Sequence, residues 1–173
     1  MSKLSIIESI LHEKFKVSNQ TCLTENDKDQ KGKVFTSSYK IVKGNNHKYG
    51  LYRYSSDAFP YFSDITDLKK MCDYILFLEE GKYLHVLIFE LKKGNDSARK
   101  QLKAAKVFVE YIVESAKRTG KLIDDLITIK MIRVSEVRIH KLKKRVQKEA
   151  NAINYIDDYC DYPYPAIYLE RLT

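Results

Sequence analysis

The chain has 173 residues, of which 44% are hydrophobic and 31% charged, and its net charge is +8. This length favours a single domain over residues 1–173, and the 13 Tyr and 7 Phe argue against disorder. No apolar run approaches the roughly 20 residues of a membrane-spanning helix, and the 3 isolated Cys provide neither a disulfide framework nor a zinc site. We therefore expect a cytoplasmic protein without membrane contact, and the positive charge favours a polyanionic partner such as nucleic acid.

The first third of the chain predicts a helix, a loop and a β-hairpin. Apolar residues recur at helical spacing over residues 4–17, at Leu4, Ile7, Leu11 and Phe15. The polar stretch 18–33 has the composition of a loop. Residues 34–42 and 49–54 are rich in β-forming residues on either side of a Gly-Asn-Asn turn, and we expect them to pair as a hairpin.

The centre of the chain predicts a second hairpin. Its strands are expected over residues 72–78 and 83–91, with a turn at 79–82. The second strand is apolar on both faces, which is typical of a strand in the middle of a covered sheet.

A helix, a strand, a helix and a strand are expected after this hairpin. The first helix begins after Ser97, ends at Gly120 and buries a stripe of apolar residues. An Ile-rich strand over 126–134, a basic helix over 142–153 and a short strand over 166–169 complete a mixed α/β fold.

Asp73, Glu90 and Lys92 are the residues best suited to carry chemistry. Glu90 and Lys92 are two positions apart on a strand, so their side chains project from the same face. Antiparallel pairing through the 79–82 turn brings Asp73 to the same end of the sheet. Two buried carboxylates are costly unless a cation offsets their charge. We expect Mg²⁺ or Mn²⁺ there, with the lysine orienting or helping to deprotonate a water molecule for attack on phosphorus.

Asp73, the Glu90-Leu91-Lys92 triplet and Gln101 on the following helix resemble the motif of the PD-(D/E)XK nuclease superfamily. The resemblance covers about residues 4–134, with Cys72 in place of the motif's proline. It implies a restriction-endonuclease-like core, in which a mixed central β-sheet is flanked by helices. It also implies that Asp73, Glu90 and the Leu91 carbonyl bind the metal and that Lys92 activates water or stabilises the transition state. Gln101 would lie near the metal or the scissile phosphate, and Glu8 on the first helix matches an additional acid that some members use.

The resemblance implies a metal-dependent nuclease, with DNA favoured over RNA as the substrate. The lysine-rich segment 141–148 is either a solvated helix face or part of a nucleic-acid groove, and the second interpretation assigns substrate contacts to Lys93, Arg99, Lys141 and Lys144. An RNA endonuclease of the same superfamily shares every site residue. A basic nucleic-acid-binding protein without catalytic activity is the alternative from another class. Because no separate recognition domain is predicted, strict sequence specificity would require a homodimer or a partner.

Overall fold

The computed structural model describes residues 2–28, 32, 34–54, 63, 65, 68–92, 97–122, 126–135, 154–156 and 159–173. The helices and strands within these residues are, in chain order, α1 (Lys3–Ile10), β1 (Cys22–Lys28), β2 (Val34–Val42), β3 (Lys48–Tyr52), β4 (Tyr74–Glu80), β5 (Tyr83–Lys92), α2 (Arg99–Arg118), β6 (Ile127–Ser135), β7 (Asn154–Ile156), β8 (Tyr159–Tyr162) and β9 (Ala166–Tyr168). Short 3₁₀ turns occupy Glu13–Phe15 and Leu169–Arg171.

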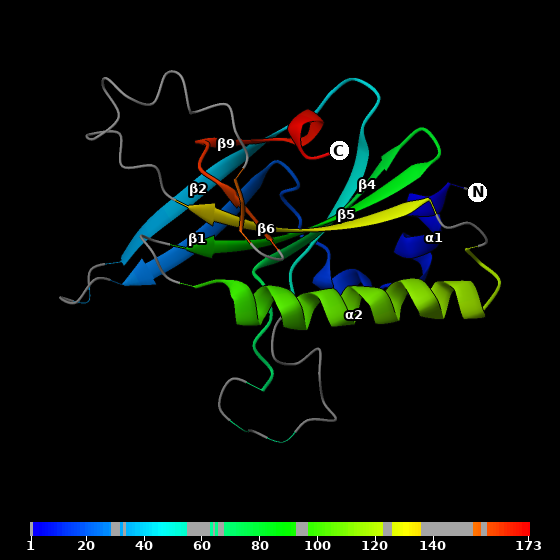
Figure 1. Cartoon of the computed structure of the whole chain (residues 1–173), viewed down its shortest axis with the longest axis horizontal. Helices are drawn as coiled ribbons and strands as arrows, with labels where there is room; N and C mark the ends of the chain where they lie inside the picture. Colours follow the sequence, from blue (N-terminus) through cyan, green and yellow to red (C-terminus); the bar gives the residue numbers. More distant parts are fainter. Residues whose placement is uncertain are drawn as a thin grey trace.

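The described strands form two sheets, both with mixed strand directions, so the predicted mixed α/β class is confirmed. The larger sheet has six strands in the order β3-β4-β5-β6-β8-β7, and the smaller has three in the order β1-β2-β9. In the larger sheet β3, β4 and β5 are antiparallel, whereas β6 is parallel to β5. Figure 1 shows α2 lying along one side of this sheet.

The first helix is shorter than predicted. It ends at Ile10, and Leu11 already has extended backbone angles. The chain then follows β3, since Val17 donates its N–H to the Leu51 carbonyl and Arg53 donates to the Phe15 carbonyl. These backbone hydrogen bonds to a strand replace those that a longer helix would have made.

The predictions for residues 18–54 were wrong in two respects. The polar stretch read as a loop contains β1, which pairs antiparallel with β2 through residues such as Leu23 and Tyr39. The expected hairpin of 34–42 with 49–54 does not form either, because β2 belongs to the smaller sheet and β3 to the larger. Composition identified both segments of that hairpin as strands, but strand propensity does not specify the partner.

The central hairpin was predicted correctly. Strands β4 and β5 pair antiparallel with Tyr74 opposite Phe89 and Glu80 opposite Tyr83, so the turn is tighter than expected and consists of Gly81 and Lys82. Gly81 has φ +57°, a left-handed conformation that glycine adopts without steric cost. Strand β5 lies between β4 and β6, as its apolar character on both faces predicted.

The second helix and the strand after it were also predicted correctly. The apolar stripe of α2 is buried, at Ala98, Leu102, Ala105, Val109, Ile112 and Ala116. Gly120 follows the helix with φ +68°, and Lys121 donates its N–H to the Ala116 carbonyl. The basic helix expected over 142–153 lies outside the described residues. The last strand forms as β9, parallel to β2, and β8 was not predicted.

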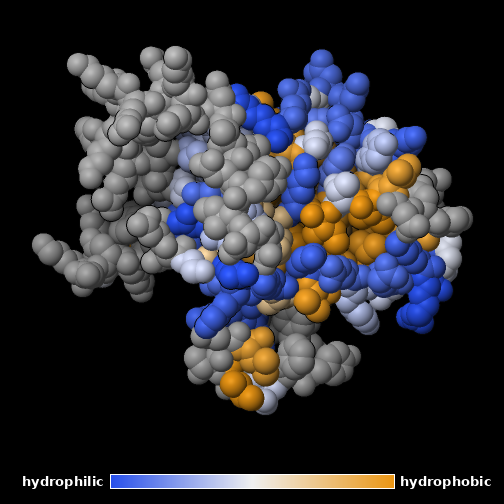
Figure 2. Space-filling model, viewed as in Figure 1, coloured by the Kyte–Doolittle hydropathy of each residue, from blue (hydrophilic) through white to orange (hydrophobic). Residues whose placement is uncertain are grey.

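Hydrophobic side chains pack on both faces of the larger sheet. On one face Phe77 and Ile88 pack with residues of α1 and α2, and on the other Leu87 packs with Leu23 and Ile41 of the smaller sheet. The molecule therefore has a helical layer, a six-stranded layer and a three-stranded layer within its described part. Figure 2 shows hydrophobic side chains gathered between α2 and the sheet, bordered by hydrophilic ones. None of the helices in the described ranges combines the length and apolar character needed to cross a bilayer.

Tyr74 joins the two sheets through its hydroxyl, which donates to the Thr24 carbonyl at 2.7 Å and accepts from the Thr24 N–H at 3.1 Å. Replacing Tyr74 with phenylalanine is expected to lower the free energy of unfolding by about 1–2 kcal/mol, because the Thr24 groups lose their partner. Urea denaturation measures this loss. Tyr111→Phe, at a tyrosine that is 69% exposed, is the matched control and should leave stability unchanged. Equal stability of the two variants would contradict the prediction.

Candidate functional site

Three side chains meet where the β4–β5 hairpin opens, and we call them the carboxylate–lysine site: Asp73, Glu90 and Lys92. Lys92 Nζ lies 2.7 Å from Glu90 Oε1, as expected for residues two positions apart on one strand. Asp73 Oδ2 accepts a hydrogen bond of 2.7 Å from the Leu91 N–H. The antiparallel register thus fixes Asp73 against the strand that carries the other two residues.

The Glu90 carboxyl is buried in surroundings that disfavour its ionised form. Glu90 is only 3% exposed. Burial, followed by the negative charge of Asp73, raises the pKa of Glu90 to about 7, although the hydrogen bond with Lys92 opposes this rise. Near neutral pH this carboxyl is therefore divided between its neutral and ionised forms, and a cation placed beside it would favour ionisation.

Lys92 stays protonated at neutral pH. Burial alone would lower the pKa of Lys92, but the hydrogen bond to Glu90 and the negative charges around it outweigh burial, and the pKa is raised. The amine is therefore a donor of hydrogen bonds and a source of positive charge at this site. It is poorly suited to accept a proton from water in this state.

Glu25 on β1 adds a third negative charge that the sequence interpretation missed. Its charge contributes to raising the pKa of both Glu90 and Lys92. Glu25 lies within the polar stretch that was read as a loop, two positions after buried Leu23 and therefore on the same face of β1, and no regular alternation of apolar and polar residues indicated a strand there. Asp73, Glu90 and Glu25 therefore all add negative potential at the Lys92 ammonium group.

The donor set of the site fits a divalent cation. Glu90 Oε1 contacts Lys92, whereas the buried Glu90 Oε2 has no hydrogen-bond partner within the described part of the chain. Buried polar atoms are seldom left in this state, and an oxygen-preferring ion such as Mg²⁺ would satisfy it. The described residues contain no cluster of three or more His, Cys, Asp or Glu side chains arranged to hold a metal. Mg²⁺ is commonly bound through one or two carboxylates with water and substrate phosphate completing its coordination, and Asp73 and Glu90 would be those two carboxylates.

The remaining predicted site residues lie on other elements or outside the described residues. Gln101 is in the first turn of α2 and half-buried, and among the described residues it makes no hydrogen bond to Asp73, Glu90 or Lys92. Glu8 pairs with Lys16 at 2.8 Å. Arg99 is exposed at the start of α2. Lys93, Lys141 and Lys144 lie outside the described residues.

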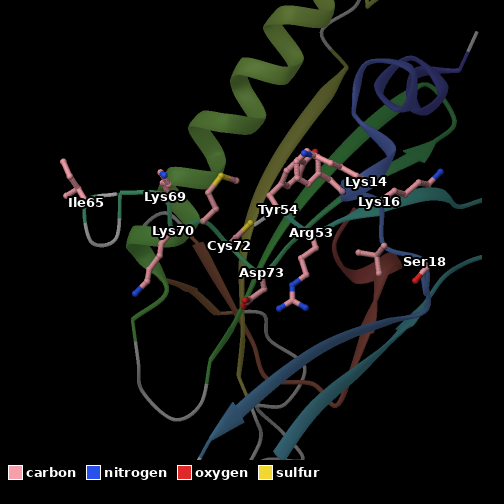
Figure 3. Close-up of a pocket in the computed structure, with 13 residues that line it drawn as sticks. Lys14, Lys16, Ser18, Arg53, Tyr54, Ile65, Lys69, Lys70, Cys72 and Asp73 are labelled. Carbon is pink, nitrogen blue, oxygen red and sulfur yellow. The ribbon is translucent and has the colours of Figure 1, made fainter. Parts of the chain in front are cut away.

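A pocket of about 750 Å³ opens beside Asp73. Its walls come from residues 14–18, from Arg53 and Tyr54, and from residues 69–73. We call it the cationic pocket, because five cationic side chains line it, namely Lys14, Lys16, Arg53, Lys69 and Lys70. Figure 3 shows Asp73 between Lys70 on one side and Arg53 on the other. Sequence reasoning missed this pocket, since its residues come from segments with no common motif.

Cys72 also lines this pocket, but its thiol is unreactive in the present environment. Burial, followed by the negative charges of Glu90 and Asp73, raises the pKa of the thiol well above its usual value.

Comparison of the chain with protein-family models, with curated proteins and with solved structures found no match.

Proposed function

We propose that this protein is a nuclease that hydrolyses phosphodiester bonds of nucleic acid, preferably DNA, with Mg²⁺ or Mn²⁺ bound by Asp73 and Glu90. The observation that carries the proposal is the buried Glu90 carboxylate, which touches Lys92, lies beside Asp73 and keeps one oxygen without a partner among the described residues. The Leu91 carbonyl would be a third protein oxygen. A cytoplasmic location and a homodimer remain predictions.

The order of the elements supports a restriction-endonuclease-like core. Helix α1 precedes three antiparallel strands, and α2 then connects β5 to the parallel strand β6. The resemblance to the PD-(D/E)XK superfamily implies a core of a helix, a mixed four-stranded sheet and a second helix beside the strand that carries the E-x-K triplet. In that arrangement Asp73 precedes the second core strand, and Glu90 and Lys92 lie at the end of the third.

In the proposed reaction the oxygen of a water molecule bonds to phosphorus, and the bond from phosphorus to a sugar oxygen breaks. The divalent cation, when bound, stabilises the negative charge that develops on the phosphate. Asp73 is held in place by the Leu91 N–H, so its position is set by the hairpin. Lys92 is protonated and donates hydrogen bonds to the water or to a phosphate oxygen. The attacking water loses a proton to solvent, and the sugar oxygen takes a proton from solvent as it leaves.

Metal uptake and cleavage together test the proposal. We expect the wild-type protein to bind Mn²⁺ in calorimetric titration and to cleave DNA with Mn²⁺ or Mg²⁺, but not with EDTA. Asp73→Asn should lower the affinity for Mn²⁺ at least about tenfold, because an amide is a poorer ligand than a carboxylate. Glu110→Gln on the exposed side of α2 is the matched control. Unchanged Mn²⁺ affinity in Asp73→Asn would show that Asp73 is not a ligand.

A non-catalytic nucleic-acid-binding protein is the second candidate, favoured by the five cations of the cationic pocket. It predicts oligonucleotide binding that weakens steeply with salt, with neither Mn²⁺ uptake nor cleavage. Single- and double-stranded DNA and RNA assayed side by side distinguish the DNA enzyme from the RNA endonuclease.

A further inference from the structure

The cationic pocket concentrates positive charge at the edge of the carboxylate–lysine site. Among the described residues that line the pocket, five are cationic and one, Asp73, is a carboxylate. Lys16 is also paired with Glu8 outside the lining. A strand of nucleic acid carries one negative charge per nucleotide, so a cluster of this kind suits successive phosphates rather than a neutral ligand.

Two of these cations lie over aromatic rings. The Arg53 guanidinium lies 5.4 Å from the centroid of the Tyr74 ring, and the Arg53 backbone N–H donates to the Phe15 carbonyl at 2.9 Å. Lys14 Nζ lies 4.7 Å from the centroid of the Phe15 ring. These contacts restrict the two side chains before binding and so lower the entropy cost of contact with a phosphate.

The pocket also has apolar lining. Phe15 and Tyr54 line it with ring centroids 4.9 Å apart and ring planes tilted by 34°, and Met71 and Ile65 contribute further apolar surface. Aromatic rings next to a line of cations are what proteins use to bind an unpaired strand, since the bases stack while the phosphates meet the cations.

The size of the pocket favours one strand over a duplex. Its volume of about 750 Å³ is within the range of about 300–1,000 Å³ that is typical of small-molecule pockets. A duplex, whose major groove alone is about 12 Å wide, does not enter a pocket of that size. A recess of this size accepts a short stretch of one strand.

We infer that the cationic pocket binds the phosphates of an unpaired nucleic-acid strand immediately beside the scissile bond, so that the enzyme acts on single strands or strand ends rather than on continuous duplex. This inference rests on the proposed nuclease function. It assigns substrate contacts to Arg53, Lys14, Lys69 and Lys70, in addition to those predicted after β5.

Oligonucleotide binding in EDTA tests this inference independently of metal binding and cleavage. The full chain is titrated, by fluorescence anisotropy, into a single-stranded oligonucleotide, the matching blunt duplex and the same duplex with an overhang. We expect the single strand and the overhang to bind at least about tenfold more tightly than the blunt duplex. The double variant Arg53→Gln/Lys69→Gln should weaken single-strand binding at least about tenfold, and should reduce the slope of log K against log salt by about 1.4.

The matched control is Lys82→Gln/Lys121→Gln, which removes the same charge at two exposed lysines away from the pocket lining. It should change single-strand binding less than about threefold. Circular dichroism confirms that both variants are folded. Equal weakening in the two variants, or equal affinity of the wild type for single strand and blunt duplex, overturns the inference even if metal-dependent cleavage is found. Absence of binding to every oligonucleotide overturns both the inference and the proposed function.

Discussion

Replacement of Lys92 with methionine is expected to lower the rate of phosphodiester cleavage about a thousandfold. Lys92 is protonated and lies 2.7 Å from Glu90, so it brings positive charge to the point where negative charge develops on the phosphate. Removal of one such donor from an active site costs about 10²–10³ in rate. Single-turnover cleavage of a labelled oligonucleotide at saturating Mn²⁺ measures the effect on the chemical step directly.

Two further variants distinguish the effect of the positive charge of Lys92 from the effect of losing a lysine elsewhere in the protein. Lys92→Arg keeps the positive charge and should retain more activity than Lys92→Met, because the proposed role is that of a donor and not of a base. Lys106→Met changes an exposed lysine on α2 that pairs with Glu110, and should cleave at the wild-type rate. If Lys92→Met also cleaves at that rate, Lys92 has no part in the reaction.

The part of the site that was predictable from the sequence is the part built from local pairing. A short turn connects β4 to β5, so once Gly81 had been recognised the register between the strands followed within one or two residues. That register places Asp73 beside Glu90 without any knowledge of the rest of the fold. Similarly, the apolar stripe and Gly120 defined α2 because both signals lie within the helix itself.

The part that was not predictable depends on contacts between distant segments. Strand β1 was not recognised in the sequence because most of its residues are polar. A strand in a small sheet tolerates such residues when one of its faces is solvated. Its contribution to the site, Glu25, was therefore missed. The cationic pocket combines residues near Lys14, Arg53 and Lys69, and a chain with 31 Lys and Arg offers no local sign of which of them converge.

Glu90→Gln is expected to stabilise the metal-free protein at pH 8 by up to about 3 kcal/mol and to have little effect at pH 5. In the unfolded chain the Glu90 carboxyl ionises near its ordinary pKa of 4.5, whereas in the folded protein burial and Asp73 raise that pKa to about 7. Each unit of pKa corresponds to about 1.4 kcal/mol. Glutamine has a similar shape and keeps an oxygen for Lys92, but does not have to ionise in the buried site.

The sign of this effect follows from proton binding. Between pH 4.5 and about 7 the folded protein holds the Glu90 proton and the unfolded chain has lost it, so the free energy of unfolding of the wild type falls as pH rises. Urea denaturation of wild type and Glu90→Gln in EDTA at pH 5 and pH 8 gives the difference at each pH. Glu114→Gln, at a side chain that is 69% exposed, is the control and should show no difference in stability from the wild type at either pH.

Mn²⁺ at a hundred times its dissociation constant should restore about 2.7 kcal/mol to the wild type and nothing to Glu90→Gln, since only the wild type keeps the carboxylate that binds it. If wild type and Glu90→Gln differ in stability by the same amount at both pH values, Glu90 ionises as an ordinary carboxyl. The buried carboxylate with a raised pKa, on which the proposed metal site depends, would then not exist.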